Sequence, residues 1–89
     1  MFYIYILYSK KDKKLYTGFA DDLRKRIIKH QKGFVKSTKD RRPLILIHYE
    51  AFINESDAKQ REIFLKSGYG KREITLLLQN YFQTNYWNK

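Results

Sequence analysis

The absence of cysteine most constrains the fold, because a short chain without disulfides or thiolate zinc sites depends on its hydrophobic core alone. The 89 residues have room for one such core, so we expect a single domain over residues 1–89. A hydrophobic content of 43%, with 17% aromatic residues, is enough to build this core and argues against a disordered chain. The lack of cysteine also removes the main argument for secretion.

The first third of the chain predicts a β-hairpin and a helix. β-Branched and aromatic residues over 2–8 and 15–19 favour two strands, and the polar, basic segment 9–14 favours a turn between them. A pair of aspartates then precedes a helical pattern over 22–32, and Gly33 suits the position after a helix end. The sequence therefore predicts a strand–turn–strand–helix unit here.

The rest of the chain predicts one more strand and two more helices. The basic segment 34–42 favours a loop, and the apolar segment 44–50 favours a third strand. Helical patterns follow over 54–66 and 71–81, whereas the aromatic tail 83–89 has no clear pattern. The apolar row of the last helix comprises Ile74, Leu77, Leu78 and Tyr81. The order ββαβαα predicts an α+β fold, in which helices flank a small, mainly antiparallel three-stranded sheet.

The charge distribution indicates the kind of partner. The formal net charge is +10, and the segment from Lys10 to Arg42 holds 13 basic and 4 acidic side chains, a net of +9. One strongly basic half favours a polyanionic partner, with nucleic acid ahead of a solubility device or an anionic membrane. No signal peptide, membrane span or amphipathic membrane helix accompanies the charge. We therefore expect a cytoplasmic protein without membrane contact or nucleotide cofactor, and with nucleic acid, DNA first, as its partner.

Two tyrosines stand on one face of the predicted hairpin. Alternation places Tyr5 of the first strand and Tyr16 of the second on the same face, if the two strands are paired that way. Packing is the simpler explanation for strand tyrosines. The next helix adds Arg26 and His30 one turn apart, and His30 continues the apolar row of that helix. A guanidinium, an imidazole and two phenols together can bind a phosphate and move protons.

A carboxylate falls on the core-facing row of the next helix. Ala58, Glu62 and Leu65 are spaced so that Glu62 shares a face with two apolar residues. A buried carboxylate is costly unless it is paired or binds a metal ion. An ion pair with Lys66, four residues on, is the alternative interpretation.

These residues resemble the motifs of the GIY-YIG nuclease superfamily, in particular its small stand-alone members. Tyr3-Ile4-Tyr5 corresponds to the first motif and Tyr16-Thr17-Gly18 to the second, followed in order by Arg26, His30 and Glu62. Tyr3 replaces the glycine of the first motif, and Thr17 replaces the isoleucine of the second. The resemblance extends from about residue 2 into the third helix.

The resemblance implies hydrolysis of DNA phosphodiester bonds with one divalent cation, Mg²⁺ or Mn²⁺. It implies Tyr5, Tyr16, Arg26, His30 and Glu62 as the catalytic set, with Glu62 as the metal ligand. One carboxylate, waters and a substrate phosphate satisfy Mg²⁺. Arg26 would hold phosphate oxygens. Tyr5 or Tyr16 would take the proton of the attacking water, and nearby cations would lower the pKa of that tyrosine. His30 would orient a tyrosine or relay its proton.

Recognition of a particular DNA sequence is not expected, because the basic loop has few side chains suited to reading base edges. We expect non-specific or structure-selective cleavage, in DNA repair or recombination. The alternatives are a nucleic-acid-binding module with weak or no cleavage, on DNA or RNA, and an RNA-binding protein. The side chains expected to contact phosphates are Lys13, Lys14, Lys29, Lys36, Lys39, Arg41, Arg42 and Lys66.

Overall fold

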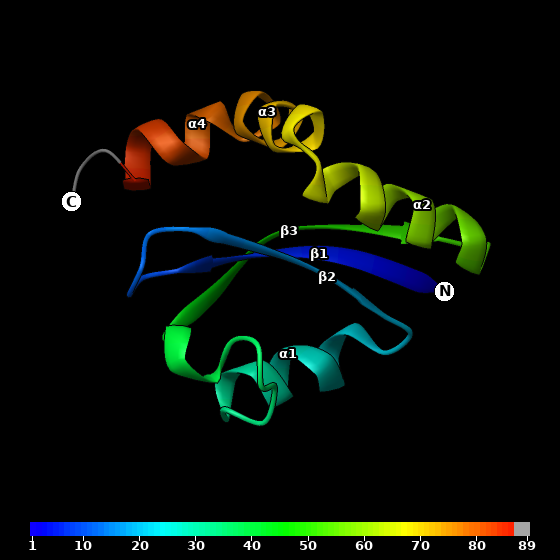
Figure 1. The fold of residues 1–89 in the computed structure, drawn as a ribbon, viewed down its shortest axis with the longest axis horizontal. Coiled ribbons are helices and arrows are strands. Elements are labelled where there is room, and N and C mark those ends of the chain that lie inside the picture. The colour runs from blue at the N-terminus through cyan, green and yellow to red at the C-terminus, as the bar shows by residue number, and fades with distance from the viewer. Residues whose placement is uncertain (87–89) are drawn as a thin grey trace.

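The computed structural model describes residues 1–86, so residues 87–89 of the expected tail lie outside the described range. Three antiparallel strands form one sheet in the order β2-β1-β3, comprising β1 (Phe2–Ser9), β2 (Leu15–Ala20) and β3 (Leu44–Phe52). The helix α1 (Leu23–Gln31) lies on one face of this sheet, and α2 (Glu55–Lys66) lies on the other (Figure 1). The predicted α+β architecture and the order of its elements are confirmed.

The central strand β1 separates two hydrophobic clusters. Ile4 and Ile6 point towards α2 and α3 (Gly68–Leu77), whereas Tyr5 and Leu7 point towards α1. All four side chains are almost fully buried. Because helices cover both faces, β1 is apolar at successive positions instead of alternating with polar residues.

The pairing of β1 with β2 sets the positions of the tyrosines. Tyr5 lies opposite Gly18, and Leu7 lies opposite Tyr16, so the two tyrosines are diagonal neighbours on one face, as predicted. The Tyr5 ring occupies the space above Gly18, where a Cβ atom would overlap its phenol end. A glycine is therefore required opposite Tyr5 for this packing.

The helix α1 begins and ends as its sequence predicts. The Asp22 carboxylate accepts a hydrogen bond from the Lys25 backbone N–H at 3.1 Å, which caps the first turn. At the other end Gly33 has a φ of 80°, and the N–H groups of Gly33 and Phe34 bond back to carbonyls of the last turn. The loop that follows contains a short 3₁₀ helix, η1 (Lys39–Arg41).

The third helix differs from the prediction. It begins at Gly68 instead of near residue 71, because the Ser67 hydroxyl accepts from the Gly70 N–H and caps the new helix. It ends at Leu77, and α4 (Gln79–Tyr81) and the π-helix η2 (Phe82–Tyr86) follow. Ile74 and Leu78 pack on the core, but Leu77 is 55% exposed, so its predicted place in the buried row is wrong. The interruption of the helix at Leu78 breaks the periodicity on which that prediction relied.

Part of the expected tail is regular. Gln83 belongs to η2, which continues the chain directly from α4. Within residues 1–86, no helix is both long and apolar enough to span a bilayer.

Candidate active site

A cluster of three ring side chains lies between β1, β2 and α1. The Tyr5 hydroxyl lies 2.7 Å from Nε2 of His30, and the Tyr16 ring centroid lies 5.3 Å from that of His30. The two tyrosine rings are 6.4 Å apart. Tyr5 and His30 are fully buried, whereas Tyr16 is half-buried. The structure thus brings the two predicted phenols together with the predicted imidazole.

The guanidinium of Arg26 contacts the same phenol. Its Nε–H donates to the Tyr5 oxygen at 3.4 Å. Arg26 is half-buried at the edge of α1 and has a raised pKa, chiefly because of the hydrogen bond to Tyr5, with Tyr16 adding to the effect. Because its Nε–H donates to Tyr5, the buried cluster fixes the orientation of the guanidinium.

His30 is held in its neutral form at the centre of the cluster. Burial and the nearby Arg26 cation lower its pKa from 6.5 to about 4. Its second ring nitrogen, Nδ1, lies 2.7 Å from the hydroxyl of Thr38, which is also fully buried. A neutral imidazole has one donor and one acceptor nitrogen. Thr38 and Tyr5 must therefore take opposite roles, one donating to the ring and the other accepting from it.

Thr38 is a site residue that sequence reasoning missed. It lies in the basic segment after α1, between the exposed Ser37 and Lys39, and no periodic pattern distinguishes it from them. Its hydrogen bond to His30 joins that segment to the ring cluster. The sequence carries no signal for Thr38, because its contact with His30 depends on how the loop after α1 folds back onto that helix.

The two phenols are in different environments. Burial raises the pKa of Tyr5 against the opposing effect of the Arg26 hydrogen bond, so the lowering that we expected for a proton acceptor is not found at Tyr5. Tyr16 accepts a solvent-exposed hydrogen bond from the Ser37 hydroxyl at 3.4 Å. Of the two, Tyr16 is the phenol that reaches the surface.

Glu62 comes from α2, on the opposite face of the sheet from α1 (Figure 1). Its carboxylate forms an ion pair of 3.0 Å with Lys66, which was the alternative interpretation of its position. Its side chain is 21% exposed, and its charge is near enough to contribute to the raised pKa of Tyr5. Both features of the prediction are therefore present, a half-buried carboxylate and a lysine that neutralises it.

The donor set at Glu62 limits the kind of metal ion that fits. Among the residues that the structure describes, no three His, Cys, Asp or Glu side chains gather into a metal site. A single carboxylate with waters and a substrate oxygen is the arrangement that Mg²⁺ accepts, whereas Zn²⁺ needs several protein ligands. Lys66 is more than half exposed, so it can move away from the carboxylate.

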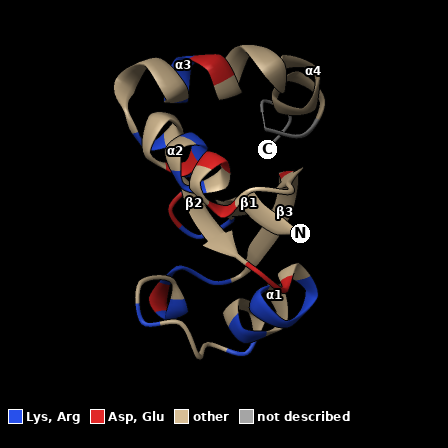
Figure 2. Ribbon diagram, turned by 90° about the vertical axis from the view of Figure 1, so that its right-hand side faces the viewer, with Lys and Arg blue, Asp and Glu red and all other residues tan. Residues whose placement is uncertain are grey.

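The side chains predicted to contact phosphates differ in their exposure and in the bonds that they make within the protein. Figure 2 shows Lys and Arg along α1 and the segment after it, whereas α2 and α3 carry both signs of charge. Arg41 is engaged, because its Nε–H donates to Asp12 at 2.6 Å and lowers the pKa of that carboxyl to about 2. Arg42 donates to the Lys39 carbonyl at 2.9 Å. All of the predicted contacts except Arg41 are exposed, and Lys66 in addition pairs with Glu62; the exposed members are Lys13, Lys14, Lys29, Lys36, Lys39, Arg42 and Lys66.

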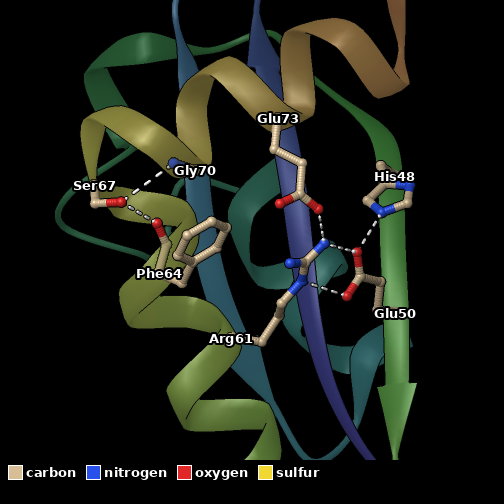
Figure 3. Close-up of polar contacts among 7 residues, drawn as sticks. All are labelled: His48, Glu50, Arg61, Phe64, Ser67, Gly70 and Glu73. Carbon is tan, nitrogen blue, oxygen red and sulfur yellow. Dashed lines mark hydrogen bonds and ion pairs between the residues drawn. The ribbon is translucent and has the colours of Figure 1, made fainter.

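A second polar network, which the sequence did not indicate, lies on the face of the sheet opposite to the ring cluster (Figure 3). Arg61 of α2 donates to Glu50 of β3 at 2.9 and 3.1 Å and to Glu73 of α3 at 2.8 Å. His48 also contacts Glu50, at 2.9 Å. The two carboxylates raise the pKa of Arg61, and the network joins three elements. Such a clamp stabilises the placement of α2, the helix that carries Glu62.

Comparisons with known proteins agree on one family. The model of the GIY-YIG catalytic domain matches residues 1–75. A UPF0213 protein of Staphylococcus saprophyticus is 45% identical over 76 residues, which cover 84% of this chain and 92% of the relative. One of Clostridium perfringens is 38% identical over 78 residues, covering 86% and 83%.

A solved structure of another UPF0213 protein also resembles this chain. The solution NMR structure of the UPF0213 protein BH0048 from Bacillus halodurans superposes with a TM-score of 0.55 at 36% sequence identity. The match covers 86% of this chain and 85% of the other. The tyrosines, Arg26, His30 and Glu62 all fall within the matched span, and this chain belongs to the GIY-YIG catalytic domain family.

Proposed function

We propose that the protein is a divalent-metal-dependent endonuclease that hydrolyses phosphodiester bonds in DNA. The observation that carries this proposal is the buried Thr38–His30–Tyr5 hydrogen-bond chain, which ends on the guanidinium of Arg26. A module that only binds nucleic acid needs exposed cations, and it gains nothing from burying a neutral histidine beside an arginine. An active site needs an arginine held in one orientation.

Arg26 would bind the scissile phosphate. With Nε directed to Tyr5, the two terminal nitrogens of its planar guanidinium remain to hold non-bridging phosphate oxygens. Charge develops on these oxygens as the nucleophile attacks, so a preorganised cation there stabilises the transition state more than the ground state. Tyr5 and His30 act through Arg26 as positioning residues, because both are buried.

Tyr16 would accept the proton of the attacking water. It is the half-buried phenol of the pair, whereas buried Tyr5 has no surface from which to meet a water molecule. Arg26 lies close enough to interact with Tyr16, because Tyr16 contributes to the raised pKa of Arg26. General base catalysis by a positioned side chain contributes about 10²- to 10⁴-fold in rate.

Glu62 would hold the metal ion, and Lys66 would move away from it to a substrate phosphate. When bound, Mg²⁺ or Mn²⁺ supplies positive charge to the scissile phosphate and the leaving oxygen. The clamp from Arg61 to Glu50 and Glu73 keeps α2 in place while the Glu62–Lys66 ion pair opens.

Nicking of supercoiled plasmid tests the proposal. We expect cleavage by the purified protein with Mg²⁺, none with EDTA, and none with the Glu62→Ala variant, which controls for contaminating nucleases. The matched control is Glu55→Ala on the same helix, whose carboxylate is exposed and pairs with Lys59 at 3.5 Å. Equal cleavage by the wild type and Glu62→Ala, or by the wild type with EDTA, would refute the proposed function.

A further inference from the structure

A cleft of about 760 Å³ opens beside the candidate active site, between the β1–β2 hairpin and the helices α3, α4 and η2. Figure 1 shows these helices above the hairpin end of the sheet. Tyr16 and Lys66 belong both to the cleft wall and to the candidate site. The two features are therefore continuous, and a polymer bound at one extends into the other.

The cleft combines an apolar floor with a cationic rim. Its floor includes Ile6, Leu65 and Ile74, which are nearly fully buried. Its rim includes the exposed Lys13, Lys14 and Lys71. None of the described residues that line it is Asp or Glu. Such a lining suits an occupant that has both flat apolar groups and negative charges.

We propose that the cleft binds unpaired nucleotides of a nucleic acid strand, with the bases on the apolar floor and the phosphates along the lysines. The relation of this site to cleavage rests on the proposed function. Paired bases in a duplex are stacked inside the helix and cannot present their faces to a protein. Unpaired bases can stack on aromatic side chains, and Phe82 lines the cleft.

Tyr16 and Lys66, which the cleft shares with the candidate site, favour a nucleic acid strand as the occupant. An acidic peptide would satisfy the same charges, but it would have no reason to lie against Tyr16 and Lys66, where the substrate phosphate is proposed to bind. A strand whose scissile phosphate is at Arg26 continues past Tyr16 into the cleft. The amide side chains of Gln79 and Gln83, which also line the cleft, can both donate to and accept from base edges.

Equilibrium binding of a fluorescent ten-residue oligothymidine, measured by anisotropy in EDTA, tests the site without cleavage. We expect Lys71→Glu to weaken binding about tenfold, whereas Arg72→Glu changes it less than threefold. Both residues are exposed neighbours on α3 with the same charge, but only Lys71 lines the cleft. Phe82→Leu keeps the apolar volume and removes the ring, and we expect it to weaken binding at least fivefold.

The results distinguish this site from the proposed function. Loss of oligothymidine binding in Lys71→Glu and Phe82→Leu supports the site even if the plasmid stays intact. Equal losses for Lys71→Glu and Arg72→Glu would overturn it, even with full nuclease activity. It would also be overturned if an acidic peptide bound in the cleft and oligothymidine did not, as judged by NMR shifts of the Thr75, Gln79 and Gln83 amides.

Discussion

Acidification from pH 7 to pH 5 should destabilise this protein through His30. The unfolded chain binds a proton at the ordinary histidine pKa of 6.5, whereas the folded protein resists it until about pH 4. Because the pKa of His30 is lower in the folded protein than in the unfolded chain, the folded state loses stability as the pH falls through the window from 6.5 to about 4. Each pH unit well inside the window contributes about 1.4 kcal/mol. We expect a loss of about 2 kcal/mol between pH 7 and pH 5.

Urea unfolding followed by circular dichroism at half-unit pH steps measures this loss. The unfolding free energy of the His30→Gln variant should change little over the same pH range. The effect of Asp12 does not interfere, because Arg41 lowers its pKa to about 2 and the stability it contributes is lost only below the window. An unfolding free energy for the wild type that is constant to within 0.5 kcal/mol (about a quarter of the expected loss) would refute the buried, neutral His30.

Three further predictions concern the hairpin and the basic segment. Tyr16→Phe should lower the single-turnover cleavage rate about 10²-fold while duplex affinity stays within threefold, and a wild-type rate would exclude the phenol as the base. Gly18→Ala should cost about 1–3 kcal/mol in urea unfolding, since the new methyl group displaces the Tyr5 ring, and an unchanged midpoint would contradict that packing. Reversing Lys36 and Lys39 to glutamate should reduce the salt slope of duplex binding by about 2, equally for unrelated sequences, and a loss confined to one sequence would argue against phosphate contacts.

Periodicity was sufficient to predict the faces of the two hairpin strands and of α1, although not of α3. Alternation along two strands put Tyr5 and Tyr16 together, and the apolar row that His30 continues pointed to the buried face of α1, where the structure buries His30 fully. These patterns succeed because one face of each element must be buried. These patterns do not show how a loop returns to the buried face, so the contact between Thr38 and His30 could not be predicted from the sequence.

The remaining differences arise where charged groups meet across elements. The Arg61 clamp joins residues from three elements, and no local spacing indicates it. The pKa of Tyr5 depends on the balance between burial and one hydrogen bond from Arg26, and burial prevails. Nor did the sequence indicate that the Ser67 cap starts α3 three residues early or that the helix is interrupted at Leu78.

The central claim is that Arg26 holds the scissile phosphate in an orientation fixed by the buried cluster. The most direct test is the single-turnover cleavage rate of Arg26→Lys at saturating Mg²⁺, measured together with its affinity for the same DNA. The substitution keeps the positive charge but loses the planar fork and the Nε–H that donates to Tyr5. We predict a rate about 10²- to 10³-fold below wild type with the affinity nearly unchanged. A rate within threefold of wild type would contradict the account, because any positive charge at that position would then suffice.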